Sequence, residues 1–153
     1  MKIRKATVQD VPKLIELTMK LRKLENSLSD RIACGEKTKN FFEMVFEKYL
    51  DDKAHVFLVA EEREVVGFAY GWKENIYPVY KNEHVGYIAD VLVEEKERGK
   101  GIGKTLVTAL EKEFKKMGLN ETKLIVLKDN IKAYDLWKEM GYADLYVEMR
   151  KDL

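Results

Sequence analysis

The chain has 153 residues, a formal net charge of +1 and 36% charged residues, so charges of both signs are mixed over its surface. This balance argues against a nucleic-acid partner, which would require a basic face. No apolar run approaches a membrane span, and the first residues lack the apolar core of a signal peptide. We therefore expect a cytoplasmic protein with no membrane association, folded as one domain over residues 1–153.

Cysteine and histidine are too sparse to suggest a metal centre. Cys34 is the only cysteine, which excludes an internal disulfide, and His55 and His84 stand isolated in the sequence. We therefore predict no metal.

Hydrophobic periodicity divides the chain into alternating helices and strands. The patterns predict a strand over 3–6, helices over about 12–25 and 38–50, strands over 55–60, 65–72 and 85–93, a helix over 102–116, a strand over 123–128, a helix over 130–139 and a strand over 141–149. An aromatic stripe in the second helix (Phe41, Phe42, Phe46 and Tyr49) is more typical of core packing than of a ligand slot. The order predicts a mixed α/β fold with at least one parallel strand pair.

A glycine-rich run, Arg98 to Lys104, lies between the strand at 85–93 and the helix at 102. Glycines, a helix N-terminus and three cations together favour an anion such as a pyrophosphate. A Walker A loop would need glycine at Arg98, and a dinucleotide fingerprint would need it at Lys104 or Leu106, so both alternatives fail. The pattern that fits is Arg-x-x-Gly-x-Gly, which resembles the coenzyme A loop of the GCN5-related N-acetyltransferase (GNAT) family.

Two further segments carry the same resemblance. Asn130, Ala133, the aromatic Trp137 and the Gly141-Tyr142 pair are similar to the second signature of the GNAT family. The opening residues Ile3 to Thr7, with Asp10, resemble the usual start of the family. The resemblance therefore covers almost the whole chain and implies a GNAT-like fold, with a mixed, mostly antiparallel sheet of six or seven strands flanked by four helices.

The resemblance implies acetyl-CoA as co-substrate and a set of residues that bind it. Backbone groups of the strand end would hydrogen-bond the pantetheine, the loop would hold the pyrophosphate, and Asn130 would either contact the cofactor or only cap its helix. The cofactor-binding residues implied are Val91, Leu92, Val93, Arg98, Gly99, Lys100, Gly101, Ile102, Gly103, Lys104, Asn130 and Trp137.

The implied reaction is direct attack of a primary amine on the thioester through a tetrahedral intermediate, with the oxyanion held by a backbone N–H near Leu92. Asp90 is the candidate base, because partial burial in an apolar strand would raise its pKa; the alternative is that it only binds the ammonium. Relatives that acetylate polyamines have Glu-Asp where this chain has Ala89-Asp90. Since adjacent strand residues normally face opposite sides, we do not expect Asp90 to replace the missing carboxylate.

The family usually has a tyrosine acid where this chain has Trp137. Tyr134, one turn earlier, is the candidate acid, although packing on the sheet is the simpler interpretation. Tyr77, Tyr80 and Glu83, in the loop after the strand at 65–72, could form a cation-accepting wall with Asp90, completed by the connection 26–37.

The sequence thus predicts an N-acetyltransferase acting on a polyamine, an aminoglycoside, an amino-acid derivative or a protein amino group. A homodimer would be compatible with the family. The alternative, from another functional class, is a non-catalytic module that binds or senses acyl-CoA.

Overall fold

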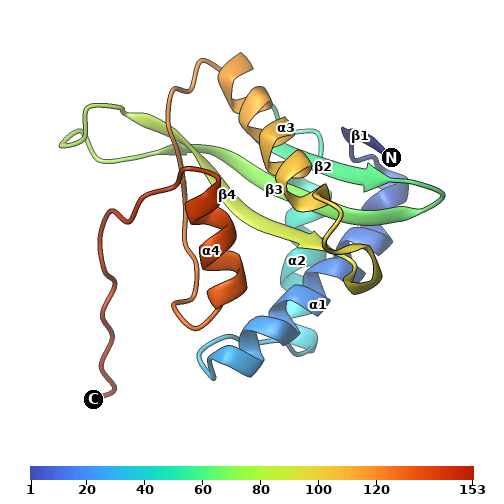
Figure 1. Cartoon of the computed structure of the whole chain (residues 1–153), viewed down its shortest axis with the longest axis horizontal. Coiled ribbons are helices and arrows are strands. Elements are labelled where there is room, and N and C mark those ends of the chain that lie inside the picture. The colour runs from blue at the N-terminus through green and yellow to red at the C-terminus, as the bar shows by residue number, and fades with distance from the viewer.

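The computed structural model describes all 153 residues and contains a five-stranded sheet with helices on both faces (Figure 1). The strands, in order across the sheet, are β1 (Lys2–Lys5), β2 (His55–Glu61), β3 (Val65–Asn75), β4 (His84–Val93) and β5 (Thr122–Leu124). Neighbours are antiparallel except β4 and β5, which run parallel. The mixed α/β class and the parallel pair are confirmed, although the sheet has fewer strands than expected.

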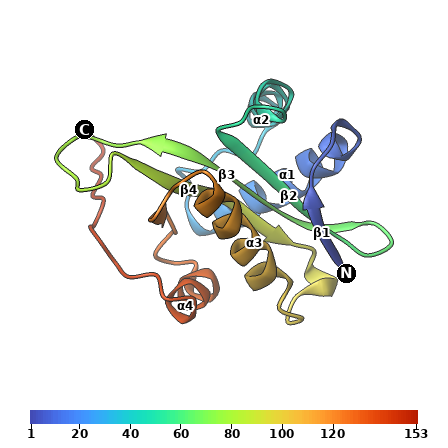
Figure 2. The same cartoon turned by 90° about the horizontal axis from the view of Figure 1, so that it is seen from above.

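The helices form a layer on each side of the sheet. α1 (Val11–Leu28) and α2 (Glu36–Tyr49) cover one face, whereas α3 (Ile102–Lys116) and the shorter α4 (Ile131–Glu139) lie on the other (Figure 2). Each face has its own apolar cluster, built around Phe46 and Phe68 on the α1/α2 side and around Leu106 and Phe114 on the α3 side. None of these helices combines the length and apolarity needed to cross a membrane.

The aromatic stripe of α2 packs into the core, as predicted. Phe46 is fully buried, its ring meets Phe57 edge-on at 5.4 Å, and Phe42 and Tyr49 pack against the same cluster. Phe41, at the edge of the stripe, is half exposed. The stripe therefore holds α2 on the sheet.

A polar cluster fixes the start of α1. Asp10 accepts hydrogen bonds from the backbone N–H of Thr7 at 2.7 Å and from Arg4 at 2.7 Å. The Arg4 guanidinium lowers the pKa of Asp10 to about 2, so the carboxylate stays charged at neutral pH. This anchor ties α1 to β1 and so fixes where the later turns of the helix meet the sheet.

The C-terminal part departs from the prediction. The strand expected over 123–128 pairs only at Thr122–Leu124, and the strand expected over 141–149 is absent: residues 143–153 have no regular structure. The apolar alternation that suggested these strands is present, but within the chain neither segment has a neighbour that completes its backbone hydrogen bonds.

Two glycines let α3 approach the sheet closely. A Cβ on Gly86 would lie 2.3 Å from the Phe114 ring, and one on Gly71 would lie 2.8 Å from the same ring. Both distances are too short for non-bonded carbon atoms, so Phe114 requires glycine beneath it. Phe114 in turn sets the position of α3 and of the glycine-rich loop that precedes it.

We predict that Gly86→Ala lowers the free energy of unfolding by about 1–3 kcal/mol, because the added methyl overpacks this contact. Urea denaturation of the purified protein measures the change. Adding Phe114→Leu should recover part of the loss, and Gly35→Ala, which meets no atom within 4 Å, serves as the control. Equal stability of the Gly86 and Gly35 variants would contradict the packing role.

Candidate active site

The site is organised by a bulge in β4. Tyr70 of β3 pairs with Asp90, but the next residue, Gly71, pairs with Ile88, so Ala89 is an extra residue in β4. A bulge of this kind bends the strand and breaks its pairing. On the other side, β4 pairs with β5 only from Gly86 to Ile88, so the two strands part at the bulge.

Beyond the bulge, β4 keeps one free edge. Glu94 donates its N–H to Val66 at 2.8 Å, and because antiparallel ladder bonds alternate, Leu92 and Asp90 also bond toward β3. The N–H and C=O groups of Val91 and Val93 therefore point away from β3, to the side that β5 has left. The Val93 carbonyl accepts a hydrogen bond from Arg98 Nε at 3.0 Å.

The same alternation bears on Leu92. Its own N–H points toward β3, so the unpaired N–H groups near Leu92 are those of its neighbours Val91 and Val93. That a backbone N–H near Leu92 holds the oxyanion stays a prediction.

The glycine-rich loop follows directly and ends at the N-terminus of α3. Gly99 and Gly101 have φ of 81° and 77°, a left-handed conformation that favours glycine, and no other atom lies within 4 Å of where their Cβ atoms would be. The first turn of α3 carries no acidic residue, so the positive end of its dipole is not neutralised there. The loop is therefore open and suited to an anion.

The three cations of the loop differ in their contacts. Lys100 pairs with Glu97 at 2.6 Å and Lys104 pairs with Glu139 of α4 at 2.7 Å. Arg98 has no carboxylate partner and is fixed by its bond to Val93. Its charge is therefore the one left uncompensated within this loop.

Asp90 points to the α1/α2 face and forms an ion pair with Arg22 of α1. The carboxylate is only 4% exposed, and Arg22 also contacts Glu25 Oε2 through Nη1 at 2.8 Å. The Arg22 guanidinium lies over the Phe42 ring, with its carbon 5.3 Å from the centroid. The Arg22 guanidinium thus lies between two carboxylates and is covered by Phe42 of α2.

Burial dominates the electrostatics of this cluster. It raises the pKa of Glu25, against the opposing effect of Arg22, and it lowers the pKa of Arg22. Burial also raises the pKa of Tyr87, which shares this face of β4. Glu25 is therefore the carboxyl group whose proton affinity the fold increases.

Because of the bulge, Ala89 and Asp90 face the same side of the sheet and not opposite sides as expected. Ala89 packs against the α1/α2 cluster, and Asp90 faces Arg22 on that same side. An extra residue interrupts the normal alternation, so the expectation that these neighbours face opposite sides is wrong. The position where polyamine acetyltransferases have a second carboxylate is next to Asp90 and apolar here.

Asn130, Tyr134 and Trp137, the site residues predicted on or next to α4, all contact residues close to them in the sequence. The Asn130 side chain accepts from the Ala133 N–H at 3.3 Å and so caps the helix. Tyr134 donates its hydroxyl proton to Asp144 at 2.8 Å, a bond that raises the pKa of Tyr134 and makes it a weaker acid. Trp137 packs edge-on against Tyr142, with ring centroids 5.3 Å apart.

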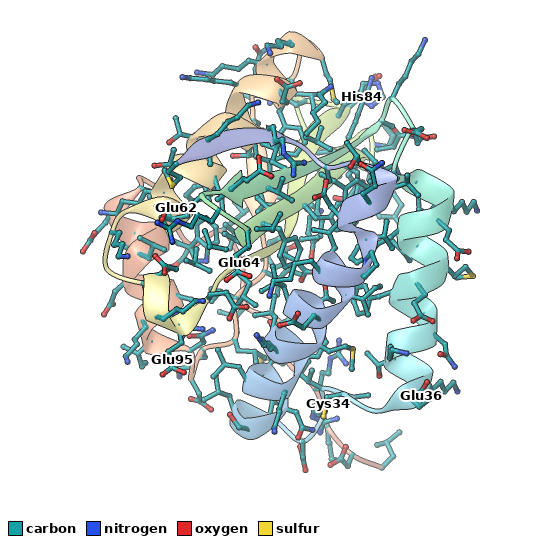
Figure 3. The ribbon with its side chains drawn as sticks, turned by 90° about the vertical axis from the view of Figure 1, so that its right-hand side faces the viewer. Cys34, Glu36, Glu62, Glu64, His84 and Glu95 are labelled. Atoms are coloured by element: carbon teal, nitrogen blue, oxygen red, sulfur yellow. The ribbon has the colours of Figure 1, made fainter.

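The predicted acceptor wall is not brought together with Asp90. Tyr77 and Tyr80 are 79% and 48% exposed at the tip of the β3–β4 hairpin, and Glu83 borders a shallow depression with Lys73 and His84. From Glu83 to Asp90 the strand covers roughly 20 Å at about 3.3 Å per residue. Figure 3 shows His84, beside this tip, at the opposite end of the molecule from Cys34 in the α1–α2 connection. The role of these three residues stays a prediction.

Sequence reasoning missed Arg22 and Glu25. Both continue the buried stripe of α1, which runs through Leu14, Thr18 and Leu21 at helical spacing. A charged residue on a buried stripe is a signal in itself, because it needs a partner inside the fold.

Comparison with known proteins identifies the family. The model of the Acetyltransferase (GNAT) family matches residues 21–142. The chain belongs to the GNAT family. Thialysine N-epsilon-acetyltransferase of Bos taurus is 30% identical, over 94% of this chain and 84% of the bovine enzyme. L-ornithine N5-acetyltransferase of Arabidopsis thaliana is 34% identical over 68% of this chain, and the match spans 42% of the plant enzyme.

The fold agrees with this assignment. The crystal structure of a predicted acetyltransferase with acetyl-CoA from Clostridium acetobutylicum superposes with a TM-score of 0.81, at 22% identity, over 97% of this chain and 95% of that one. This GNAT chain is thus an acetyl-CoA-dependent N-acetyltransferase, the enzyme class predicted from the two motifs.

We predict that Arg22 and Asp90 are strongly coupled in stability. Arg22→Met leaves the buried Asp90 unpaired and should cost about 3–5 kcal/mol, whereas the double variant Arg22→Met with Asp90→Leu should recover most of that loss, the remainder reflecting Glu25. Denaturant unfolding of the two single variants and the double variant measures the coupling. Lys39→Met removes two exposed ion pairs on α2, with Glu36 and Glu43, and should change stability by less than about 1 kcal/mol. Additive effects of the two single variants would refute a buried pair.

Proposed function

We propose that this chain transfers acetyl from acetyl-CoA to the side-chain amine of a small diamino acid. The observation that supports this acceptor is the Arg22 guanidinium between Asp90 and Glu25, on the face of β4 where the strand bulges. The cluster presents both charge signs, and a zwitterionic acceptor with a second amine carries both as well.

The residues at the split between β4 and β5 fit acetyl-CoA. The unpaired backbone groups of Val91 and Val93 would hydrogen-bond the amide groups of the pantetheine arm, as another strand would. The open loop from Arg98 to Lys104 would hold the pyrophosphate on the N-terminal N–H groups of α3, with Arg98 as the uncompensated charge. The bound cofactor supplies the thioester that the amine attacks.

Two atoms of the charged cluster retain unused bonding capacity. Arg22 Nε is buried without a hydrogen-bond acceptor, and Glu25 Oε2 is buried near Arg22 Nη1 but without hydrogen-bond geometry. Buried polar atoms normally have partners, so each is a candidate contact for a ligand. Arg22 Nε would donate to the acceptor's carboxylate and Glu25 would accept from an ammonium group.

The named relatives support an acceptor of this kind. By their names, the bovine enzyme acts on the ε-nitrogen of thialysine and the plant enzyme on the N5 of L-ornithine. Both compounds are amino acids with an amine at the end of the side chain. A polyamine has no carboxylate to pair with Arg22.

The reaction needs a base for the ammonium, a donor for the oxyanion and a proton for the thiolate, and we assign each in turn. Glu25 is the group we propose to accept a proton from the ammonium: burial raises its pKa, and its Oε2 contacts Arg22 without hydrogen-bond geometry, whereas Asp90 accepts a hydrogen bond from Arg22. An unpaired N–H at Val91 or Val93 would stabilise the oxyanion. Tyr134, bonded to Asp144, gains no support as the acid for the thiolate, so water is the proton source we propose.

Thiol release with acetyl-CoA tests the acceptor, using ornithine and putrescine as a matched pair that differs only in the carboxylate. One charge-assisted contact contributes about 1.5–3 kcal/mol, so kcat/KM for ornithine should exceed that for putrescine by about 10- to 100-fold. Glu25→Gln should lower kcat/KM for ornithine by a similar factor and leave the KM for acetyl-CoA unchanged.

Equal or better turnover of putrescine would contradict the assignment to amino acids. Binding of acetyl-CoA with no turnover on ornithine, thialysine, polyamines, aminoglycosides or N-terminal peptides would instead favour a non-catalytic acyl-CoA-binding module.

A further inference from the structure

Glu94, the residue directly after β4, is bonded to three other parts of the fold. Its N–H donates to the Val66 carbonyl of β3 at 2.8 Å, and its own carbonyl accepts from the Glu97 N–H at 2.9 Å, in the turn that leads to the glycine-rich loop. Its side chain is 15% exposed and accepts hydrogen bonds from Lys13 at 2.9 Å and from Lys20 at 2.8 Å, both on α1. Glu94 therefore joins the end of β4 to the helix that carries the charged cluster of the proposed acceptor side.

The two lysines form a network of four charges with Glu94 and Glu16. Glu16, which lies between them on α1, accepts from Lys13 at 3.0 Å and from Lys20 at 2.6 Å. Hydrogen bonds from Lys20 and Lys13 hold the pKa of Glu94 below its usual value, and hydrogen bonds to Glu16 and Glu94 raise the pKa of Lys20. All four groups are therefore charged at neutral pH, and a network of this kind can fix geometry where an isolated surface pair does not.

This network and the Asp90 ion pair hold α1 on opposite flanks. Leu21 belongs to the buried stripe of the helix. In an α-helix, Lys20 lies about 100° to one side of Leu21 and Arg22 lies about 100° to the other. Lys20 binds Glu94, and Arg22 binds Asp90 of β4. Rotation of α1 about its axis would therefore break one of these two contacts.

We propose that Glu94 is a positioning residue, which fixes the rotation of α1 and so sets where Glu25 stands relative to the thioester. The inference rests on the proposed function, in which Glu25 takes the proton of the attacking ammonium. The Glu94 carboxylate is bonded to Lys13 and Lys20, so it acts on the reaction through the helix on which Glu25 follows. Because Glu94 also continues the strand from Val93, one side chain joins the acceptor side to the edge proposed for coenzyme A.

Two matched variants separate positioning from general stability. Glu94→Gln removes the charge that ties the lysines to the end of β4, whereas Glu16→Gln removes the partner that the same lysines have within α1. With ornithine, kcat of Glu94→Gln should fall by about 10- to 100-fold, because a misplacement of about 1 Å can cost that much. Glu16→Gln should keep the wild-type kcat, and both variants should keep the wild-type KM for acetyl-CoA.

The titration of Glu25 gives a readout that a merely structural role would not move. Burial raises the pKa of Glu25, and Arg22, which opposes this effect, is present in both variants. A rotation of α1 would expose the carboxylate to water and so lower its pKa. NMR titration of the glutamate carboxyl groups, assigned with Glu25→Gln, should show a lower pKa for Glu25 in Glu94→Gln than in the wild type or in Glu16→Gln.

Equal kcat for Glu94→Gln and Glu16→Gln would overturn the proposal, and so would the same Glu25 pKa in both variants and the wild type. A higher KM for acetyl-CoA at unchanged kcat would also overturn it, because Glu94 would then act on the glycine-rich loop. If the wild type does not turn over ornithine, the acceptor assignment fails, and the Glu25 titration alone decides the role of Glu94.

Discussion

The bulge at Ala89 is the local feature on which both sides of the proposed active site depend. It ends the pairing of β4 with β5 and leaves the backbone of Val91 and Val93 without a strand partner. The same extra residue turns Asp90 toward α1, where it meets Arg22. A regular β4 would close the gap where the pantetheine is proposed to lie and would aim Asp90 differently.

The helices convert this local irregularity into a site. Phe114, seated on Gly71 and Gly86, positions α3 so that the glycine-rich loop follows the free end of β4. On the other face, α1 supplies Arg22 and Glu25, and α2 covers them with Phe42. The groups proposed to bind acetyl-CoA thus lie at the split between β4 and β5 and in the loop, while the charged cluster on the α1/α2 face is the proposed acceptor side.

The sequence predicted those parts of the fold that local chemistry determines. Glycine spacing identified the loop and Asn130 identified the start of α4, because each depends on a few neighbouring residues. The ion pair between Arg22 and Asp90 could not be predicted from the sequence. The two residues are far apart along the chain, and the bulge that aligns them has no clear local signal in the sequence. The strand expected over 141–149 failed for another reason: alternation shows that a segment can pair, and a partner must also be present.

Backbone amide exchange tests most directly the claim that β4 offers an unpaired edge to coenzyme A. Without ligand, the Val91 and Val93 amides should exchange much faster than that of Leu92, which bonds toward β3. Saturating coenzyme A should slow Val91 and Val93 and leave Leu92 as it was. Equal protection of all three amides without ligand, or no change at Val91 and Val93 on saturation, would contradict the account.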